Sequence, residues 1–240
     1  AQLIELGSGS SAKVGLLLDA LASPYSYVPI DISREHLLAA ARRVQALYPR
    51  LRVEAVCADF GQVFDLPVNR GGGRRVGFYP GSTIGNLEPA EAMAFLSAWA
   101  LRLGQGALMI VGVDLRKSVL ILEPAYDDDQ GVTAQFSMNL LVRANRELGA
   151  DFDTRRFRHR ARYHVESGRL GIDLVSLTDQ VVTIDGIRFD LEEGEPIHVE
   201  NSWKYAIGDF QAMARGAGFR TIEVWTDPKE LFSVHLLEVG

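Results

Sequence analysis

Residues 2–13 read QLIELGSGSSAK, which combines a run suited to a buried strand with a glycine turn that follows it directly. Glycines at the junction of a strand and a helix let a ligand approach the backbone closely. The turn therefore predicts a cofactor site at Gly7, Ser8 and Gly9. The spacing through Ala12 also satisfies the looser fingerprint of dinucleotide-binding enzymes, so a nicotinamide oxidoreductase remains an alternative at this point.

The sequence that follows alternates short apolar runs with longer segments of helical spacing. Strands are predicted at residues 2–6, 27–31, 51–57, 75–79 and 106–114. Helices are predicted at residues 12–22, 33–48 and 89–102, the second with Ser33 as N-cap and the third with Pro89 in its first turn. This alternation predicts a parallel sheet, and right-handed crossovers place helices on both of its faces.

After Asp114 the pattern changes to one helix followed by paired strands. The helix is predicted at residues 129–148. Two β-hairpins are predicted at residues 157–165 with 170–177, and at residues 181–184 with 187–191. Their turns fall at Ser167-Gly168 and Asp185-Gly186, so this stretch predicts an inserted lobe.

The α/β pattern returns with a helix at residues 207–217 and strands at residues 219–226 and 232–239. Two strands after the last helix predict a terminal hairpin at the sheet edge, an ending typical of class I methyltransferases and unusual for dinucleotide dehydrogenases. The predicted fold class is α/β: a doubly wound, mostly parallel, seven-stranded, Rossmann-like sheet of the class I S-adenosylmethionine (SAM) methyltransferase type, with an inserted α+β substrate lobe. The predicted domains are residues 1–115 with 201–240 for SAM binding and residues 116–200 for substrate recognition.

Acidic residues after two of the strands extend the predicted cofactor site. Asp31 ends the second strand, where a carboxylate accepts both hydroxyls of a ribose, as it also does in NAD enzymes. Asp59 and Phe60 follow the third strand, where an acid accepts the adenine amino group and a ring lies on the base. Each acid alone fits equally well as a cap of its turn. Lys13 lies in the first helical turn, where the dipole disfavours a cation, so it either reaches the cofactor's carboxylate or is solvated.

A longer motif, FYPGSTIGNL at residues 78–87, resembles the histidine-specific Nα-methyltransferases of ergothioneine biosynthesis in its Gly-Ser-Thr-Ile-Gly-Asn core. The glycine turn with Lys13 is similar to the family's Gly-Ser-Gly-x-Ser-x-Lys. Two further matches are Tyr126-Asp127-Asp128 with Gly131-Val132-Thr133-Ala134, and Glu200-x-Ser202-x-Lys204-Tyr205. The resemblance spans essentially the whole chain, in order.

The resemblance implies a SAM-dependent N-methyltransferase that converts L-histidine to trimethylhistidine (hercynine), the first step of ergothioneine biosynthesis. It implies that Asn86 and Tyr126, with backbone near Gly81, hold the α-amino and α-carboxylate groups, and that Asn86 and Tyr126 are the catalytic pair. From the residues alone, Asn86 fits equally well as a turn residue and Tyr126 as a core or rim tyrosine.

The resemblance also implies that Glu200 and Ser202 read the imidazole and that Ile172 packs against its ring. A carboxylate that accepts one N–H and a hydroxyl that meets the other nitrogen discriminate histidine from apolar isosteres. Without the resemblance, Glu200 and Ser202 fit better as an exposed loop acid and an N-cap serine before the helix near Asp209.

Members of that family normally carry several tens of residues before the first strand as part of the substrate lobe, whereas the first predicted strand here begins at residue 2. We therefore expect a complete cofactor site and an amino-acid site open on one side. Two alternatives stay open: a SAM-dependent methyltransferase of another amino acid or small amine, and a cofactor-binding domain without turnover.

Composition limits the partners. A net charge of -6 over 240 residues argues against nucleic acid, whose phosphates favour clustered positive charge. The single cysteine, Cys57, forms no internal disulfide and points to a reducing, cytoplasmic location. No apolar run has the length of a membrane span, and we expect neither a membrane signal nor an export signal. We expect L-histidine as a small-molecule partner, neither nucleic acid nor membrane as a partner, and a monomer.

Two charged features are assigned no chemistry. Arg156, Arg158, Arg160 and Arg162 share one face of a predicted strand, which favours a solvated hairpin face over an RNA site. The acidic run at residues 127–129 suits the start of a helix, and without a histidine cluster it predicts no metal site.

Overall fold

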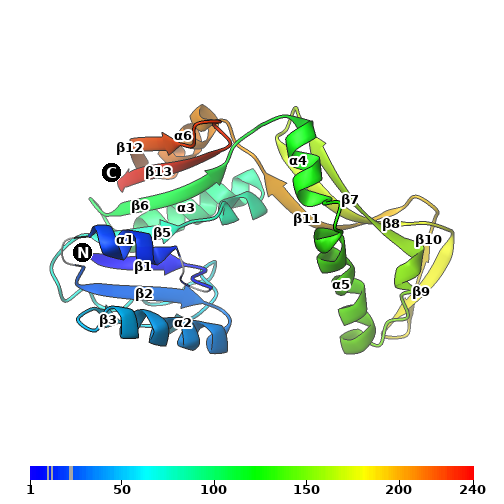
Figure 1. Ribbon diagram of the computed structural model, residues 1–240, viewed down its shortest axis with the longest axis horizontal. Helices are drawn as coiled ribbons and strands as arrows, with labels where there is room; N and C mark the ends of the chain where they lie inside the picture. The colour runs from blue at the N-terminus through cyan, green and yellow to red at the C-terminus, as the bar shows by residue number, and fades with distance from the viewer. Residues whose placement is uncertain (10, 12, 22–23) are drawn as a thin grey trace. The chain divides into compact units, whose positions relative to one another are not determined.

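The structure is a computed structural model that describes residues 1–9, 11, 13–21 and 24–240 (Figure 1). It divides into two compact units, Ala1–Leu115 with Tyr205–Gly240, and Arg116–Lys204. The second unit ends at Lys204 rather than at residue 200 because a strand, β11 (Pro196–Trp203), pairs within this unit to its last residue.

The first unit is built on one sheet. Its strands are β1 (Gln2–Leu6), β2 (Ser26–Asp31), β3 (Arg52–Val53), β4 (Val56–Cys57), β5 (Arg75–Tyr79), β6 (Leu108–Asp114), β12 (Phe219–Thr226) and β13 (Phe232–Val239). They lie in the order β12-β13-β6-β5-β1-β2-β3, with β4 also paired to β2. β13 is antiparallel to β6 and β12, and the other pairs are parallel. The predicted mostly parallel sheet with a terminal hairpin at its edge is confirmed.

Helices cover both faces of this sheet (Figure 1). On one face, α1 (Val14–Ala20) and α2 (Arg34–Leu47) bury Val14, Leu18 and Val44 against Leu3 and Tyr27 of the strands. α3 (Pro89–Leu103) and α6 (Ile207–Gly216) contact each other and pack on the sheet through β5 and β12. Because strand residues alternate faces, Phe78 joins the first core while its neighbour Tyr79 packs on Phe95 of α3, with ring centroids 5.0 Å apart.

The helix boundaries follow local chemistry. Pro89 is the first residue of α3, and Glu88 and Glu91 form a capping box, so the predicted start is confirmed. Ser33 occupies the N-cap position of α2, but its side chain makes no capping hydrogen bond. The predicted first helix is shorter than expected: α1 begins at Val14, and the predicted ends at residues 12 and 22 lie outside the described residues.

The predicted third strand, residues 51–57, is wrong as one continuous element because β3 and β4 are separated by Glu54 and Ala55. Both pair with β2 in the same register, Tyr27 with Val53 and Ile30 with Val56. Glu54 donates its N–H to the carbonyl of Tyr27 on β2. The next residue of β2 that faces the same neighbouring strand is Pro29, which has no N–H to donate in return. The missing donor interrupts the ladder without shifting it.

The second unit joins two helices to antiparallel strands. The helices are α4 (Val119–Tyr126) and α5 (Val132–Leu148), and a 3-10 turn, η2 (Thr154–Arg156), precedes the strands. β7 (Phe157–His164), β8 (Arg169–Ser176) and β11 form a sheet in the order β11-β8-β7, and β9 (Gln180–Ile184) pairs with β10 (Ile187–Leu191). Both predicted hairpins are confirmed, the second with Asp185 and Gly186 at φ 50° and 77°, as a two-residue turn requires.

Two elements of this unit are absent from the sequence-based prediction. α4 carries four consecutive apolar residues, 119–122, and an internal proline, Pro124, so its pattern shows no helical face. β11 begins with a proline, is largely polar, and shifts register between His198 and Glu200. The reading of Glu200 and Ser202 as a loop acid and an N-cap serine is wrong, because both lie within this strand.

Candidate active site

The glycine turn after β1 is held by the neighbouring strand. Gly7 and Ser8 both donate their N–H groups to the carbonyl of Ile30, at 2.9 and 3.0 Å. Gly7 and Gly9 adopt φ of 66° and 48°, which L side chains rarely adopt. A Cβ on Gly7 would stand 3.3 Å from the ring of Phe60. Glycine at position 7 therefore allows both the backbone conformation of the turn and the close contact with the ring of Phe60.

Asp31 ties the turn to the next crossover. Its Oδ2 accepts the N–H of Gly9 and its Oδ1 accepts the N–H of Ser33, each at 2.9 Å. A carboxylate oxygen has two lone pairs, so each of these oxygens keeps one for a further donor. The arrangement fits a carboxylate that holds the turn and receives two ligand hydroxyls.

Lys13 and Gly81 meet although they lie on different segments. A Cβ on Gly81 would stand only 2.8 Å from Lys13 Nζ, and Gly81 has φ 79°. Gly112 of β6 lies directly behind the loop that carries Gly81. A Cβ on Gly112 would lie 3.1 Å from the backbone nitrogen of Gly81, so the loop can take this position only beside a glycine. Because Gly81 and Gly112 have no side chains, Lys13 and the loop after β5 can lie close together at the carboxyl ends of the strands.

These groups surround a pocket of about 280 Å³. It is lined by Glu5, Gly7, Ser8, Gly9, Lys13, Pro80, Gly81 and Thr83. Ser8 Oγ is buried and has no hydrogen-bond partner within the described part of the chain. Because buried polar groups are normally paired, this hydroxyl is suited to a ligand in the pocket.

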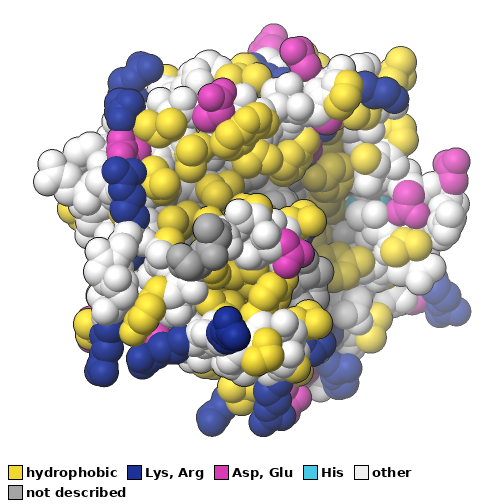
Figure 2. All heavy atoms as spheres, turned by 60° about the vertical axis from the view of Figure 1, so that its left-hand side comes forward, with side chains coloured by type: hydrophobic (Ala, Val, Ile, Leu, Met, Phe, Trp, Pro, Cys, Tyr) yellow, Lys and Arg dark blue, Asp and Glu magenta, His cyan; other side chains and the backbone are white. Residues whose placement is uncertain are grey.

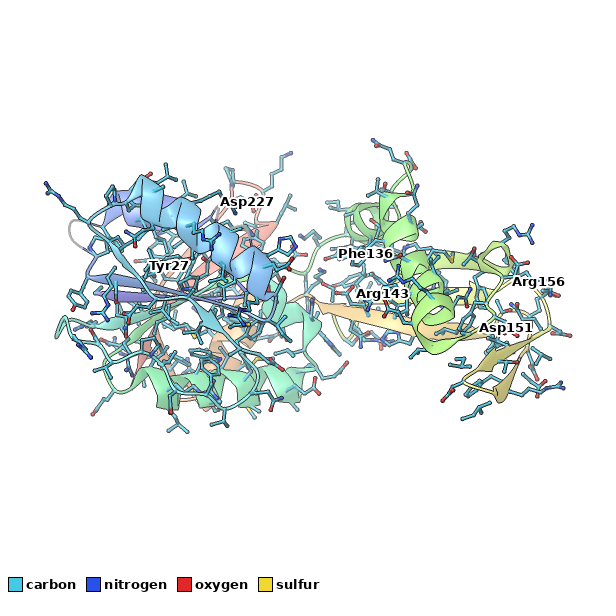
Figure 3. All side chains as sticks on the ribbon, turned by 90° about the horizontal axis from the view of Figure 1, so that it is seen from below. Tyr27, Phe136, Arg143, Asp151, Arg156 and Asp227 are labelled. Carbon is cyan, nitrogen blue, oxygen red and sulfur yellow. The ribbon has the colours of Figure 1, made fainter. Side chains whose placement is uncertain are left out.

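Glu5 is the buried acid of this pocket. It receives a short hydrogen bond from the hydroxyl of Tyr27, which in turn lies 3.0 Å from Ser11 Oγ (Tyr27 is labelled in Figure 3). Burial raises the pKa of Glu5 to about 7, partly offset by the hydrogen bond from Tyr27 and the charge of Lys13. Burial therefore moves the titration of this carboxyl toward neutral pH.

Asp59 and Phe60 make local contacts in the loop after β4. Asp59 Oδ1 accepts the N–H of Gly61 at 2.8 Å. The ring of Phe60 meets Tyr79 and Phe95 edge-on, at centroid distances of 5.8 and 6.1 Å. Phe60 thereby forms a wall beside Gly7. The contact of Asp59 with Gly61 is the turn-capping contact that the sequence offered as one of two alternatives for this acid.

An apolar hollow of about 390 Å³ adjoins Lys13 and Gly81. Its walls include Leu16 and Leu17 of α1, Phe78 of β5 and Phe232 of β13. Figure 2 shows hydrophobic side chains gathered on one face of the molecule, with charged side chains of both signs around them.

The loop after β5 carries a strained residue. Ser82 has φ 60°, which is uncommon for a residue with a side chain, and its Oγ accepts the N–H of Asp114 at 2.9 Å. The following residues form a 3-10 turn, η1 (Thr83–Asn86), that buries Ile84 and Gly85 and leaves Asn86 exposed. The motif therefore presents the amide of Asn86 at the surface of the first unit.

In the second unit, three polar side chains form one cluster. Lys204 Nζ lies 2.7 Å from Tyr126 Oη and 2.7 Å from Ser202 Oγ, and these two oxygens are 3.1 Å apart. The ammonium group also lies 4.6 Å from the centroid of the Tyr126 ring. Lys204 is 1% exposed and Ser202 is 5% exposed, so the cluster is buried.

Ile172 and Glu200 lie beside this cluster. Ile172 of β8 is opposite Glu200 of β11 and packs in a core with Leu122, Tyr163 and Tyr126. At 3% exposure, Ile172 supports the wall of the site from within that core. Glu200 and Ser202 are two residues apart on one strand and so share a face of the sheet.

The two charged features without assigned chemistry have structural partners. β7 alternates buried and more exposed residues as predicted, and its Arg160 pairs with Asp173 of β8 at 2.8 Å. At the start of α5, Asp128 accepts the N–H groups of Val132 and Thr133, which lowers its pKa to about 2. Among the described residues, no group of three or more histidine, cysteine or acidic side chains is arranged to hold a metal ion.

No helix in the described ranges combines the length and hydrophobicity that a membrane crossing requires.

The structure thus groups the predicted residues in two sets. Gly7, Ser8, Gly9, Lys13, Asp31 and Gly81 converge in the first unit, and Tyr126, Ile172, Glu200 and Ser202 in the second. Sequence reasoning missed Glu5, although an acid inside an otherwise apolar strand is a signal for a buried charge, and it assigned no role to Lys204.

Comparison with known proteins identifies the family. Residues 1–239 match the model of a family described as histidine-specific, SAM-dependent methyltransferases. The histidine N-alpha-methyltransferase of Mycobacterium tuberculosis is 39% identical over 240 residues, and that of Mycolicibacterium smegmatis is 38% identical over 239. Each alignment covers 98% of this chain and 74% of the relative.

Solved structures agree on the fold. The CcbJ methyltransferase from Streptomyces caelestis aligns with all of this chain and 83% of its own at a TM-score of 0.54 and 18% identity. The family match over residues 1–239 favours a methyltransferase over the nicotinamide oxidoreductase that the glycine spacing had left open. The chain belongs to the histidine-specific, SAM-dependent methyltransferase family, a class I methyltransferase family whose cofactor is SAM.

Proposed function

We propose that this protein transfers methyl groups from SAM to the α-amino nitrogen of L-histidine, three times in succession, and so makes trimethylhistidine, the first step of ergothioneine biosynthesis. The observation that carries the proposal is the family match over residues 1–239. The cluster of Tyr126, Ser202 and Lys204 beside Glu200 supports it, since these groups suit a polar five-membered ring.

In this proposal the first unit holds the cofactor. Gly7, Ser8 and Gly9 present their turn to it, and the buried, unpaired Ser8 Oγ donates a hydrogen bond. Lys13 binds its carboxylate from above Gly81. Asp31 receives the ribose hydroxyls on its remaining lone pairs.

The loop after β4 binds the adenine end of the cofactor. Asp59 keeps its second carboxylate oxygen for the adenine amino group, because Oδ1 accepts the N–H of Gly61. Phe60, fixed by Tyr79 and Phe95, offers its ring to the base.

The amino acid is held by its two ends. Asn86, with backbone at Gly81, and Tyr126 hold the α-amino and α-carboxylate groups. Glu200 accepts an N–H of the imidazole, Ser202 meets its other nitrogen, and Ile172 backs the wall on which the ring packs.

Alignment is the main task of these side chains. When bound, SAM supplies an electrophilic methyl group on a sulfonium centre. A peptide α-amino group titrates near about pH 8 and that of a free amino acid somewhat higher, so a useful fraction of the substrate is already neutral at physiological pH. Asn86 and Tyr126 orient the nitrogen lone pair and pass the released proton to water, with no strong base required.

We also propose that the protein acts as a monomer in the cytoplasm, with neither nucleic acid nor a membrane as a partner. The net charge of -6 and the single cysteine support this setting. Light scattering after size-exclusion chromatography tests the monomer, and a dimer would contradict it.

The function is tested by incubating the purified chain with SAM and, separately, each common amino acid, followed by mass spectrometry. Calorimetry measures binding of S-adenosylhomocysteine in parallel. Methylated histidine alone is the expected result. Methylation of another amino acid favours the alternative substrate class, and cofactor binding without any product favours a binding domain without turnover.

A further inference from the structure

A lysine buried as deeply as Lys204 needs a reason. It is 1% exposed, and its ammonium group contacts the hydroxyls of both Tyr126 and Ser202 at 2.7 Å. Burying an ammonium group costs solvation free energy even when it is hydrogen-bonded. The proposed roles of Tyr126 and Ser202 do not by themselves require a cation behind them.

The ammonium group fixes the direction of these hydrogen bonds. An ammonium group has three hydrogens to donate and no lone pair to accept with. Tyr126 Oη and Ser202 Oγ must therefore both act as acceptors toward Lys204. Neither hydroxyl can direct its own hydrogen at the lysine.

The two hydroxyl groups carry two hydrogens, neither of which points at Lys204. The two oxygens are 3.1 Å apart, so one hydroxyl donates to the other. A phenol is a stronger hydrogen-bond donor than an aliphatic alcohol, and the alcohol is the better acceptor, so Tyr126 donates to Ser202. Ser202 Oγ then accepts from both Lys204 and Tyr126, which occupies its two lone pairs and leaves only its hydrogen for a ligand.

We propose that Lys204 is a positioning residue that makes Ser202 an obligatory hydrogen-bond donor, so that the site takes the neutral imidazole of histidine and rejects the imidazolium. The inference rests on the proposed function, which places the imidazole at Glu200 and Ser202. A neutral imidazole has one N–H for Glu200 and one lone pair for Ser202, whereas an imidazolium has two N–H groups and no lone pair.

Other titratable and charged groups surround the cluster. Glu123 of α4 accepts the backbone N–H of Tyr163, and Arg169 of β8 donates to Asn201 of β11. Glu200 lies on the same face of β11 as Ser202. None of these contacts supplies Ser202 with a hydrogen-bond acceptor.

His159 of β7 is a second imidazole beside the cluster, and it contacts the backbone of Tyr126. Its Nε2 lies 2.8 Å from the carbonyl oxygen of Tyr126 and must donate to it. Its Nδ1 is buried and has no hydrogen-bond partner in the described structure. Replacement by glutamine keeps a donor for the Tyr126 carbonyl and removes the protein's own imidazole from this place, which makes His159→Gln a control.

The test uses trimethylhistidine as the probe, because its α-nitrogen carries no titrating proton and its imidazole is the group that changes charge. Calorimetry measures its dissociation constant for the full chain saturated with S-adenosylhomocysteine, at about pH 7.5 and about pH 5.5. With a reference imidazole pKa of about 6.5, exclusion of the imidazolium predicts binding about tenfold weaker at the lower pH. The His159→Gln variant is expected to keep this ratio.

Lys204→Met removes the cation and frees a lone pair on Ser202, so the imidazolium gains an acceptor. The ratio is expected to fall from about tenfold to less than about threefold, or to reverse, since Glu200 favours a cationic ring. Lys229→Met, which removes an exposed lysine between β12 and β13, is the matched control and is expected to keep the wild-type ratio. Binding of S-adenosylhomocysteine reports that each variant is folded.

The outcomes are distinct. A tenfold ratio in the wild type that collapses only in Lys204→Met supports the inference. Equal or tighter wild-type binding at the lower pH overturns it while leaving the proposed function intact, and this result needs no variant. An unchanged ratio in a folded Lys204→Met protein also overturns it. Absence of binding at about pH 7.5 overturns the proposed substrate, and the inference with it.

Discussion

Replacing Glu5 by glutamine is expected to change how the stability of the protein depends on pH. Glu5 is 2% exposed, accepts a hydrogen bond from Tyr27, and has its pKa raised by burial from 4.5 to about 7. The folded protein therefore keeps this proton in a range where the unfolded chain releases it. The resulting stabilisation is complete below the unfolded value and is lost as the pH rises through about 7.

The size of the effect follows from the two pKa values. Since one pKa unit is worth about 1.36 kcal/mol, the difference corresponds to about 3 kcal/mol in total, most of which is lost between pH 5 and pH 8. Glutamine keeps an acceptor for the Tyr27 hydroxyl but does not titrate. The free energy of unfolding of Glu5→Gln, relative to wild type, is therefore expected to rise by about 2 to 3 kcal/mol over that interval.

The assay is urea unfolding followed by circular dichroism at pH 5, 6, 7 and 8 for the wild type, Glu5→Gln and Glu166→Gln. Glu166 is exposed between β7 and β8, so its variant serves as the matched control. Wild-type and Glu5→Gln stabilities that run parallel across this range would refute the reasoning, because the buried carboxyl would then titrate alike in the folded and unfolded states.

Three further substitutions test separate parts of the structure. Asn86→Ala is expected to lower turnover on the order of 10²-fold while leaving S-adenosylhomocysteine affinity unchanged by calorimetry, and equal turnover would remove Asn86 from the catalytic pair. Gly81→Ala places a Cβ 2.8 Å from Lys13 Nζ in a backbone region of φ 79°, so cofactor affinity is expected to fall at least about tenfold; wild-type affinity would contradict the packing of Lys13 over Gly81. Leu174→Ala removes a fully buried side chain from the core of the second unit and is expected to cost about 2 to 5 kcal/mol in urea unfolding, whereas a loss below about 1 kcal/mol would contradict that core.

Much of the fold is predictable from local patterns. Buried runs followed by turns identify most strands of the first sheet, and Asp185-Gly186 predicts its hairpin because both residues tolerate positive φ. What pattern analysis missed depends on partners distant in sequence. β11 is recognisable only through its pairing with β8, and the break between β3 and β4 follows from a proline on the adjacent strand.

The candidate site, too, is predictable from the sequence only in part. Gly7, Gly9 and Asp31 follow strands at positions where a ligand-binding loop is expected, and Asp31 indeed bonds to Gly9. The roles of Glu5 and Lys204 depend instead on side chains from other strands and helices. The raised pKa of Glu5 comes from burial, and the direction of the bonds at Lys204 comes from two hydroxyls that sequence spacing alone does not bring together.

The most direct measurement locates the transferred methyl groups. The chain is incubated with SAM labelled with deuterium in its methyl group and with an equimolar mixture of amino acids, and the products are fragmented in a mass spectrometer. We predict that histidine alone is labelled and that its final product carries three labelled methyl groups, all on the fragment with the α-nitrogen. Label on an imidazole nitrogen, label on another amino acid, or no label from a folded chain that binds S-adenosylhomocysteine would contradict histidine Nα-methylation as the function of this protein.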